Sequence, residues 1–258
     1  MKITVLGSGG ASGVPSIEWG WGLCDPENPK NRRMRPSMLV EEQNSRVLID
    51  TSPDLHWQLL GNDIRALDAV LFTHAHADHV HGIDDLRAVN RAMRKPIPIW
   101  ADDVTLGDLK SRFGYCLGDL PEGVTNFFRP VLIPHRTGPG ETIELGKFRI
   151  SVFDQDHGYC RTLTYRFGPI AYSTDVVEMP DETLDGLRGV DVWVVSALMR
   201  DPHPTHAHLD KVLGWVERVK PRRTILSHLS GVFDYETLKS ELPDGVEPAY
   251  DGLTVEAI

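Results

Sequence analysis

A short segment of the chain carries four side chains of types that bind transition metals. The apolar run Ala69–Phe72 is followed closely by His74, His76, Asp78 and His79. His74 and His76, two residues apart in an extended segment, point to the same side and can share one cation. Asp78 and His79 stand where the chain turns toward a predicted helix, so they can face a second cation. Imidazole with carboxylate suits Zn²⁺, Fe²⁺ or Mn²⁺ better than Ca²⁺ or Mg²⁺. The alternative is a polar loop with solvated histidines.

Two cations need more than four ligands, and three other residues occupy comparable positions. His157, Asp175 and His228 each come shortly after a predicted strand ends. Binding sites are often built from the loops at one end of a sheet. A single histidine after a strand is more often a surface or capping residue. Three such residues beside the dense cluster favour a shared metal site.

The elements that must position these residues are short apolar runs alternating with amphipathic stretches. The predicted strands are Ile3–Leu6, Ser37–Val40, Arg46–Ile49, Ala69–Phe72, Ile97–Trp100, Arg149–Phe153, Thr162–Phe167, Ile170–Tyr172, Val190–Val195, Thr224–Leu226 and Leu253–Ile258. The predicted helices are Pro53–Leu60, His81–Met93, Val104–Phe113, Leu209–Val219 and Tyr235–Leu242. This alternation indicates an α/β (α+β) protein with sheets covered by helices. No repeat or long linker divides it, so we expect one domain over residues 1–258.

The amino-acid composition restricts the kinds of molecule that the protein can bind. The 258 residues include 27 Lys+Arg and 37 Asp+Glu, a formal net charge of −10. This balance argues against a protein that grips bulk nucleic acid through a broad basic surface. No uncharged segment approaches the ~20 apolar residues of a membrane span. The three cysteines form no CxxC pair. We therefore expect a cytoplasmic protein with no membrane partner.

The HxHxDH motif at His74–His79 resembles the signature of the metallo-β-lactamase superfamily. Within that superfamily the chain looks most like the PhnP-type phosphodiesterases, which open five-membered cyclic phosphates. The segments that carry this narrower likeness are Gly13–Pro15, Asn31–Arg33, Arg35–Ser37, His81–Arg87 and His203–His206. The resemblance implies a four-layer αββα sandwich and a hydrolase that uses two divalent cations, zinc or manganese.

The resemblance also implies a role for each candidate residue. The implied ligands of one metal are His74, His76 and His157, those of the other are Asp78, His79 and His228, and Asp175 bridges the two. A water between the cations would attack phosphorus, oriented by Asp78. His206 matches the family's catalytic histidine, so we expect it to donate a proton to the leaving alkoxide and to contact the phosphate. The alternative for His206, as for its neighbours His203 and His208, is to cap or solvate a helix start.

The implied substrate is a small cyclic or nucleotide-like phosphodiester of the 5-phosphoribosyl 1,2-cyclic phosphate type. Alternatives within the superfamily are a tRNA 3′-end nuclease and a thioester or lactam hydrolase. A metal-dependent binding protein without turnover is the alternative outside enzymes. Oligomeric state stays open, with a homodimer possible.

Several relatives carry a further structural zinc, held by N-terminal cysteines and a histidine after the last metal ligand. Here the matching loop Ile17–Asn28 keeps only Cys24, and Gly231 stands three residues past His228. One thiolate cannot form a closed tetrahedral site. We therefore expect no structural zinc.

Two further motifs lie near the N-terminus. The run Gly7–Gly13 fails the GxGxxG frame at Ser12 and predicts a backbone that approaches the metal site closely. Lys30, Arg32, Arg33 and Arg35 place four positive charges in six residues. Such a run is usually a solvated loop, and phosphate binding is nearly as plausible.

Overall fold

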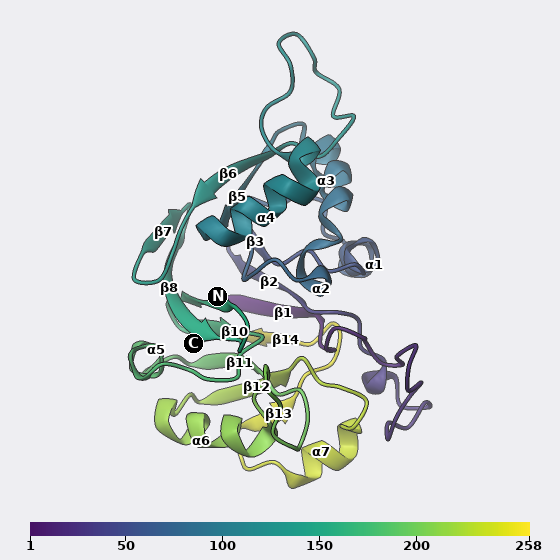
Figure 1. Cartoon of the computed structure of the whole chain (residues 1–258), viewed down its shortest axis with the longest axis vertical. Helices are drawn as coiled ribbons and strands as arrows, with labels where there is room; N and C mark the ends of the chain where they lie inside the picture. The colour runs from purple at the N-terminus through teal and green to yellow at the C-terminus, as the bar shows by residue number, and fades with distance from the viewer.

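Two seven-stranded sheets form the centre of the computed structural model, which describes residues 1–258 (Figure 1). The first sheet contains, in spatial order, β14 (Thr254–Glu256), β1 (Lys2–Gly7), β2 (Ser37–Glu42), β3 (Ser45–Ile49), β4 (Ala69–Leu71), β5 (Ile97–Ala101) and β6 (Leu132–Arg136). The second contains β13 (Val246–Pro248), β12 (Arg223–Ser227), β11 (Val192–Ser196), β10 (Ile170–Ser173), β9 (Arg161–Phe167), β8 (Phe148–Asp156) and β7 (Thr142–Leu145).

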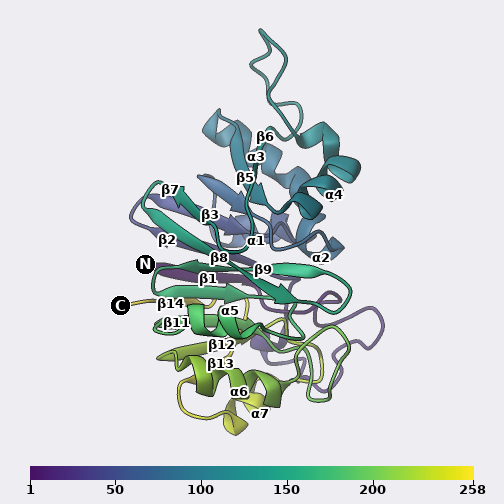
Figure 2. The same ribbon diagram turned by 60° about the vertical axis from the view of Figure 1, so that its left-hand side comes forward.

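Helices cover the outer face of each sheet (Figures 1 and 2). The first sheet carries α1 (Leu55–Gly61), α2 (Ala77–Val80), α3 (Leu86–Met93) and α4 (Asp103–Phe113), and the second carries α5 (Asp181–Gly186), α6 (Leu209–Val219) and α7 (Tyr235–Glu241). Short 3₁₀ turns span Pro29–Asn31, Ile83–Asp85 and Gly114–Cys116. On α6 the residues Leu209, Val212, Trp215 and Val219 are buried at helical spacing. The helix ends at Lys220 in the left-handed conformation, just before Pro221.

Apolar side chains from both sheets meet in one central core. Ile3 and Val47 of the first sheet belong to the same buried cluster as Tyr165 and Val194 of the second. One further buried cluster lies between the first sheet and its helices, and another lies between the second sheet and its helices. The arrangement is the predicted four-layer αββα sandwich. None of the helices combines the length and the hydropathy needed to cross a lipid bilayer.

Strand direction gathers the functional loops at one edge. β1 is antiparallel to β2 and β2 to β3, while β3 and β4 are parallel. In the second sheet, β8 and β10 both run antiparallel to β9, and β10 to β12 run parallel. All the predicted ligands therefore follow the carboxyl ends of β4, β8, β10 and β12, in the connecting loops or in α2.

The structure differs from the predicted elements in several places. Over the helix predicted at His81–Met93 the structure has a 3₁₀ turn, Ile83–Asp85, followed by α3, and α2 ends just before this range at Val80. Gly82 explains the break, because a Cβ there would lie 2.0 Å from the carbonyl oxygen of Ser52 and its N–H donates to Thr51 at 2.9 Å. The sequence pattern did not reveal β6, β7, β13, α2 and α5. Trp57 on α1 is 67% exposed.

Candidate metal centre

Four candidate ligands follow β4, His74 and His76 in the loop and Asp78 and His79 in α2, and they face three loops of the second sheet. Two groups of side chains result, and in each the potential ligand atoms lie within 4.8 Å of one another. The first group is His74, His76, His157 and Asp175, and the second is Asp78, His79, Asp175 and His228. All seven predicted metal ligands are thus brought together, and Asp175 belongs to both groups.

Asp175 uses a different oxygen toward each group. Its Oδ2 lies 3.9 Å from Nε2 of His74 and 3.5 Å from Nε2 of His157. Its Oδ1 lies 3.2 Å from Nε2 of His79 and 3.3 Å from Nδ1 of His228. A carboxylate placed in this way can bridge two cations.

Hydrogen bonds leave the Nε2 lone pairs of three histidines facing the cluster. Nδ1 of His157 donates to the carbonyl oxygen of Thr205 at 2.7 Å, and Nδ1 of His79 donates to Asp50 at 2.7 Å. The Thr73 hydroxyl donates to Asp50, so it accepts from Nδ1 of His74 at 3.0 Å. A neutral imidazole whose Nδ1–H is held in this way presents Nε2 as a metal ligand.

Several buried polar atoms in the cluster have no hydrogen-bond partner. They are Nε2 of His74, Nε2 of His79, Oδ2 of Asp78 and both ring nitrogens of His228. Leaving such atoms unpaired in the interior costs about 1–3 kcal/mol each. Divalent cations would satisfy them, so the donor set fits a pair of such ions.

The protonation states follow from burial and from neighbouring charges. Burial lowers the pKa of His74 well below its usual value, so this ring is neutral, the form a metal requires. Burial also opposes protonation of His79, but the carboxylates of Asp78, Asp175 and Asp50 outweigh it and raise its pKa well above the usual value. A proton and a cation therefore compete for His79, and acid favours release of the cation.

Sequence reasoning missed Asp50, which binds Thr73 and His79 in the segment of candidate ligands. Its carboxylate is fully buried and accepts from the Thr73 N–H at 2.8 Å, the Thr73 hydroxyl at 2.8 Å and the His79 ring. Asp50 directly follows β3, so its position after a strand is the signal that could have identified it.

Backbone conformation distinguishes three residues of the centre. Asp50, Asp175 and His228 have φ angles of 62°, 52° and 58°. Non-glycine residues seldom adopt this left-handed region, although Asp and His do so more than most. Such conformations persist where the surrounding structure enforces them, and they concentrate at functional sites.

His206 lies beside the centre rather than at a free helix start. Its ring stacks on His228 with centroids 5.0 Å apart and meets His157 edge-on at 4.7 Å. Burial lowers the pKa of His206 to about 3, and Nδ1 has no partner. His203 instead contacts Thr205 through Nδ1, and His208 precedes α6 without a side-chain capping bond.

A cleft of about 740 Å³ opens beside His206 and His228. Its other walls are the loop after β1 and the segments 198–199 and 230–232. The predicted close backbone approach is present here, since a Cβ on Gly10 would lie 3.4 Å from the His228 ring.

Two arginines of the basic run, Arg33 and Arg35, bind other parts of the protein. Arg33 is buried and donates to the carbonyl oxygens of Ser230 at 3.1 Å and Phe233 at 2.6 Å. Its guanidinium also lies 3.8 Å from the Cys24 sulfur, which itself contacts Phe233. Arg35 binds Asp54 through two nitrogens. Neither a solvated loop nor a phosphate site describes Arg33 or Arg35.

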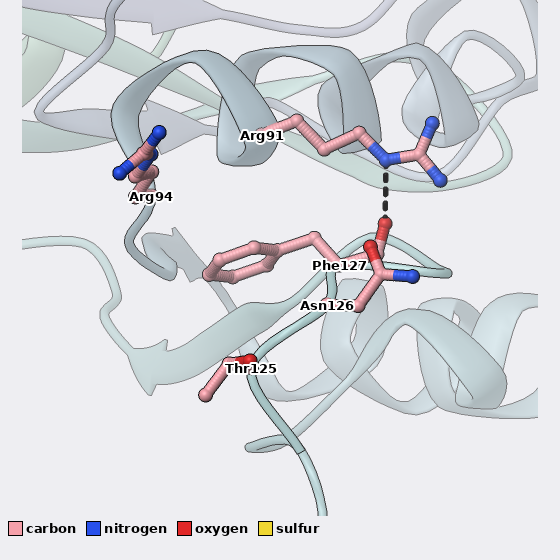
Figure 3. Close-up of a pocket in the computed structure, with 5 residues that line it drawn as sticks. All are labelled: Arg91, Arg94, Thr125, Asn126 and Phe127. Atoms are coloured by element: carbon pink, nitrogen blue, oxygen red, sulfur yellow. Dashed lines mark hydrogen bonds between the residues drawn. The ribbon is translucent and has the colours of Figure 1, made fainter.

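A second hollow of about 410 Å³ lies between α3 and the loop that precedes β6 (Figure 3). It is lined by Arg91, Arg94, Thr125, Asn126 and Phe127, and Arg91 donates to the carbonyl oxygen of Phe127 at 2.8 Å. None of the predicted site residues lines it.

Known proteins resemble the chain in both sequence and fold. Residues 45–229 match a family described as the beta-lactamase superfamily domain. A crystal structure of a new diphosphatase from the PhnP family is 36% identical, with a TM-score of 0.90 over 100% of this chain and 98% of that one. The short form of human tRNase Z shares the fold, with a TM-score of 0.69 at 16% identity over 99% of each chain.

Curated relatives are longer. An octanoyltransferase of Porphyromonas gingivalis is 29% identical over 98% of this chain and 51% of its own length. A ribonuclease Z of Methanopyrus kandleri is 29% identical over 54% of this chain and 45% of its own length. The chain thus spans about half the length of the curated relatives it matches.

Proposed function

Since the chain belongs to the beta-lactamase superfamily and to its PhnP family, we propose that it is a metal-dependent phosphoric diester hydrolase. The observation that supports this most is the pair of ligand groups joined through Asp175, with unpartnered nitrogen and oxygen atoms facing both. The substrate we propose is a small cyclic or nucleotide-like phosphodiester. The specific candidate that the resemblance implies is of the 5-phosphoribosyl 1,2-cyclic phosphate type.

The proposed cofactor is a pair of divalent ions, zinc or manganese. His74, His76 and His157 would hold one ion, Asp78, His79 and His228 the other, and Asp175 both. When bound, such a pair supplies a nucleophile from water at neutral pH and neutralises charge on the phosphoryl group.

The protein's own residues would perform the remaining tasks. Asp78 keeps Oδ2 free of hydrogen bonds, so it can accept one from the attacking water and orient it. His206 faces the same centre from the cleft and can donate a proton to the leaving alkoxide. Its free ring is neutral at pH 7, because its pKa is about 3. A bound phosphate anion beside the ring raises that pKa and favours the protonated donor.

A substrate panel tests this proposal. With Mn²⁺ or Zn²⁺ added, the protein and an Asp175→Asn control are assayed on bis(p-nitrophenyl) phosphate, 2′,3′-cyclic nucleotides, a thioester, a chromogenic lactam and a tRNA precursor with a 3′ trailer. We expect cleavage of the small phosphodiesters by the native chain alone. Turnover of only the thioester or lactam would replace the proposal with that hydrolase class.

A ribonuclease Z activity is the second candidate, because curated ribonucleases Z match up to 54% of the chain. Cleavage of the tRNA precursor with no turnover of small diesters would favour it. Metal binding without turnover of any substrate would indicate a binding protein.

A further inference from the structure

The cleft beside His206 bears on which phosphodiester the centre accepts. His206 and His228 line its inner end, and Trp19, Leu23, Leu198 and Val232 contribute apolar walls. If the centre binds a phosphodiester as proposed above, the organic group on the His206 side extends into this cleft. The role of the cleft in substrate choice therefore rests on the proposed function.

The wall formed by the loop after β1 is held in place by backbone contacts. The N–H of Leu23 donates to the carbonyl oxygen of Gly231 at 2.7 Å. Gly22 packs so tightly there that a Cβ would lie 2.4 Å from the same oxygen. Figures 1 and 2 show this purple segment on the side of the molecule that carries α7. The cleft is therefore preformed.

Large apolar side chains stay accessible along this wall. Trp19 is 74% exposed and Leu23 is 75% exposed, although both line the cleft. An indole at the mouth of a cleft offers a flat face on which a planar ring can stack. Base–aromatic stacking is sequence-tolerant and contributes substantially to binding of nucleic-acid bases.

Lysine and arginine side chains are absent from the lining of the same cleft, whose basic residues are the histidines His203, His206 and His228. The carboxylate of Glu18 is the one acidic side chain among the lining residues. Of the arginines nearby in sequence, Arg35 pairs with Asp54 and Arg200 with Glu241 at 2.7 Å, while the Arg32 guanidinium lies over the Trp21 ring at 5.1 Å. Arg33 is buried against backbone carbonyls.

We infer that the organic group of the substrate on the His206 side is an uncharged planar ring system, such as a nucleobase, and that Trp19 selects for it. A second phosphate on that group would meet Glu18 and no guanidinium or ammonium. Within the proposed class, the cleft thus favours a nucleoside cyclic phosphate over the 5-phosphoribosyl 1,2-cyclic phosphate that the resemblance implies, because the latter carries another phosphate.

Three substrates with the same scissile ring separate these possibilities. They are adenosine 2′,3′-cyclic phosphate, its 5′-phosphorylated form, and the 2′,3′-cyclic phosphate of methyl riboside, which lacks the base. We expect kcat/KM for the adenosine compound to exceed both others roughly tenfold or more, mainly through KM. Binding of adenosine alone, measured by calorimetry, gives a readout independent of turnover.

Substitutions of cleft residues test whether the cleft causes the preference for the adenosine compound. Trp19→Ala should remove most of the advantage of the base and weaken adenosine binding roughly tenfold, while methyl riboside turnover stays within about twofold. Trp57→Ala, at an exposed tryptophan on α1, is the matched control and should change neither. Glu18→Arg should raise kcat/KM for the 5′-phosphorylated substrate several-fold relative to adenosine.

The outcomes are distinguishable from failure of the proposed function. Hydrolysis of bis(p-nitrophenyl) phosphate together with equal kcat/KM for the adenosine and methyl riboside compounds would overturn the cleft inference alone. Preference of the native chain for the 5′-phosphorylated form would do the same. Absence of turnover on every phosphodiester would overturn both.

Discussion

At the scale of single residues, the centre depends on hydrogen-bond partners of Nδ1, which determine where the Nε2 lone pair of each histidine points. His74, His79 and His157 each have Nδ1 engaged, so Nε2 faces the cluster. Thr73 and Asp50 supply two of these contacts without facing the centre themselves. The ligands and their supports therefore form one hydrogen-bonded unit, in which a change to a support alters a ligand.

Asp50→Asn tests that unit. The amide cannot accept both Thr73 contacts and the His79 N–H as the carboxylate does, so His79 loses its fixed orientation. We expect metal affinity to fall roughly ten- to hundredfold, measured by competition with a chromophoric chelator. Asp54→Asn is the control, because Asp54 also follows β3 but pairs with Arg35. Equal affinities for native and Asp50→Asn protein would contradict the assignment.

His206→Ala tests the proton donor. We expect kcat on small phosphodiesters to fall roughly a hundredfold to ten-thousandfold, the usual contribution of general acid catalysis. Bound metal, measured by elemental analysis, should not change, since His206 belongs to neither ligand group. His208→Ala, two residues further along, should keep near-native turnover. A His206→Ala enzyme within a few-fold of native would refute the role.

At the scale of elements, residue types and their spacing predicted the segment of candidate ligands, the strands that precede it and α6. The dense His/Asp cluster is rare, and Leu209, Val212, Leu213, Val216 and Val219 of α6 repeat at helical spacing. β6 was missed because Leu132–Arg136 contains Pro134 and is exposed over its last three residues, and β7 and β13 because neither contains a run of apolar residues. These segments are strands because they pair with β5, β8 and β12, and sequence periodicity does not reveal such pairing.

Supports such as Asp50 and Arg33 carry only a weak signal in the sequence. A single Asp after a strand is common, and a basic run ordinarily lies in solvent. Arg33 is buried because carbonyl oxygens from Ser230 and Phe233, about 200 residues later, meet its guanidinium. Only the fold brings those partners to it.

Asp251 joins the last loop of the chain to the first two strands. It accepts from Ser8 N–H at 2.8 Å, the Ser8 hydroxyl at 2.7 Å and Met34 N–H at 2.7 Å. Burial nevertheless raises its pKa to about 6 from the ordinary value of 3.8. The folded protein therefore holds a proton on Asp251 at pH values where the unfolded chain has lost it.

The consequence is a stability that falls as pH rises. The contribution of Asp251 is fully present below about pH 4 and is lost as pH rises through about 6, by at most about 3 kcal/mol. Urea unfolding of native and Asp251→Asn protein between about pH 4 and 7 measures it. We expect the advantage of the native protein over the variant to shrink across this range. An advantage that is constant or grows with pH would contradict the assignment.

At the scale of the whole molecule, the centre connects the two halves of the sandwich. His74, His76, Asp78 and His79 follow β4 of the first sheet, while His157, Asp175 and His228 follow strands of the second. Two divalent cations there would add about four positive charges locally. A chain with a net charge of −10 can thus present a positive site to a phosphate.

Cations held between the sheets should stabilise the entire fold, because they bind the folded chain and not the dispersed ligands of the unfolded one. Loading at about a thousandfold above the dissociation constant contributes about 4 kcal/mol, equivalent to roughly 10 °C in Tm for a chain of this size. We therefore expect EDTA to lower Tm by that amount, in a single transition followed by calorimetry. Asp175→Asn lacks the shared ligand, so its Tm should respond much less to EDTA. A native Tm that EDTA leaves unchanged would show that the centre holds no cation tightly enough to couple the two sheets.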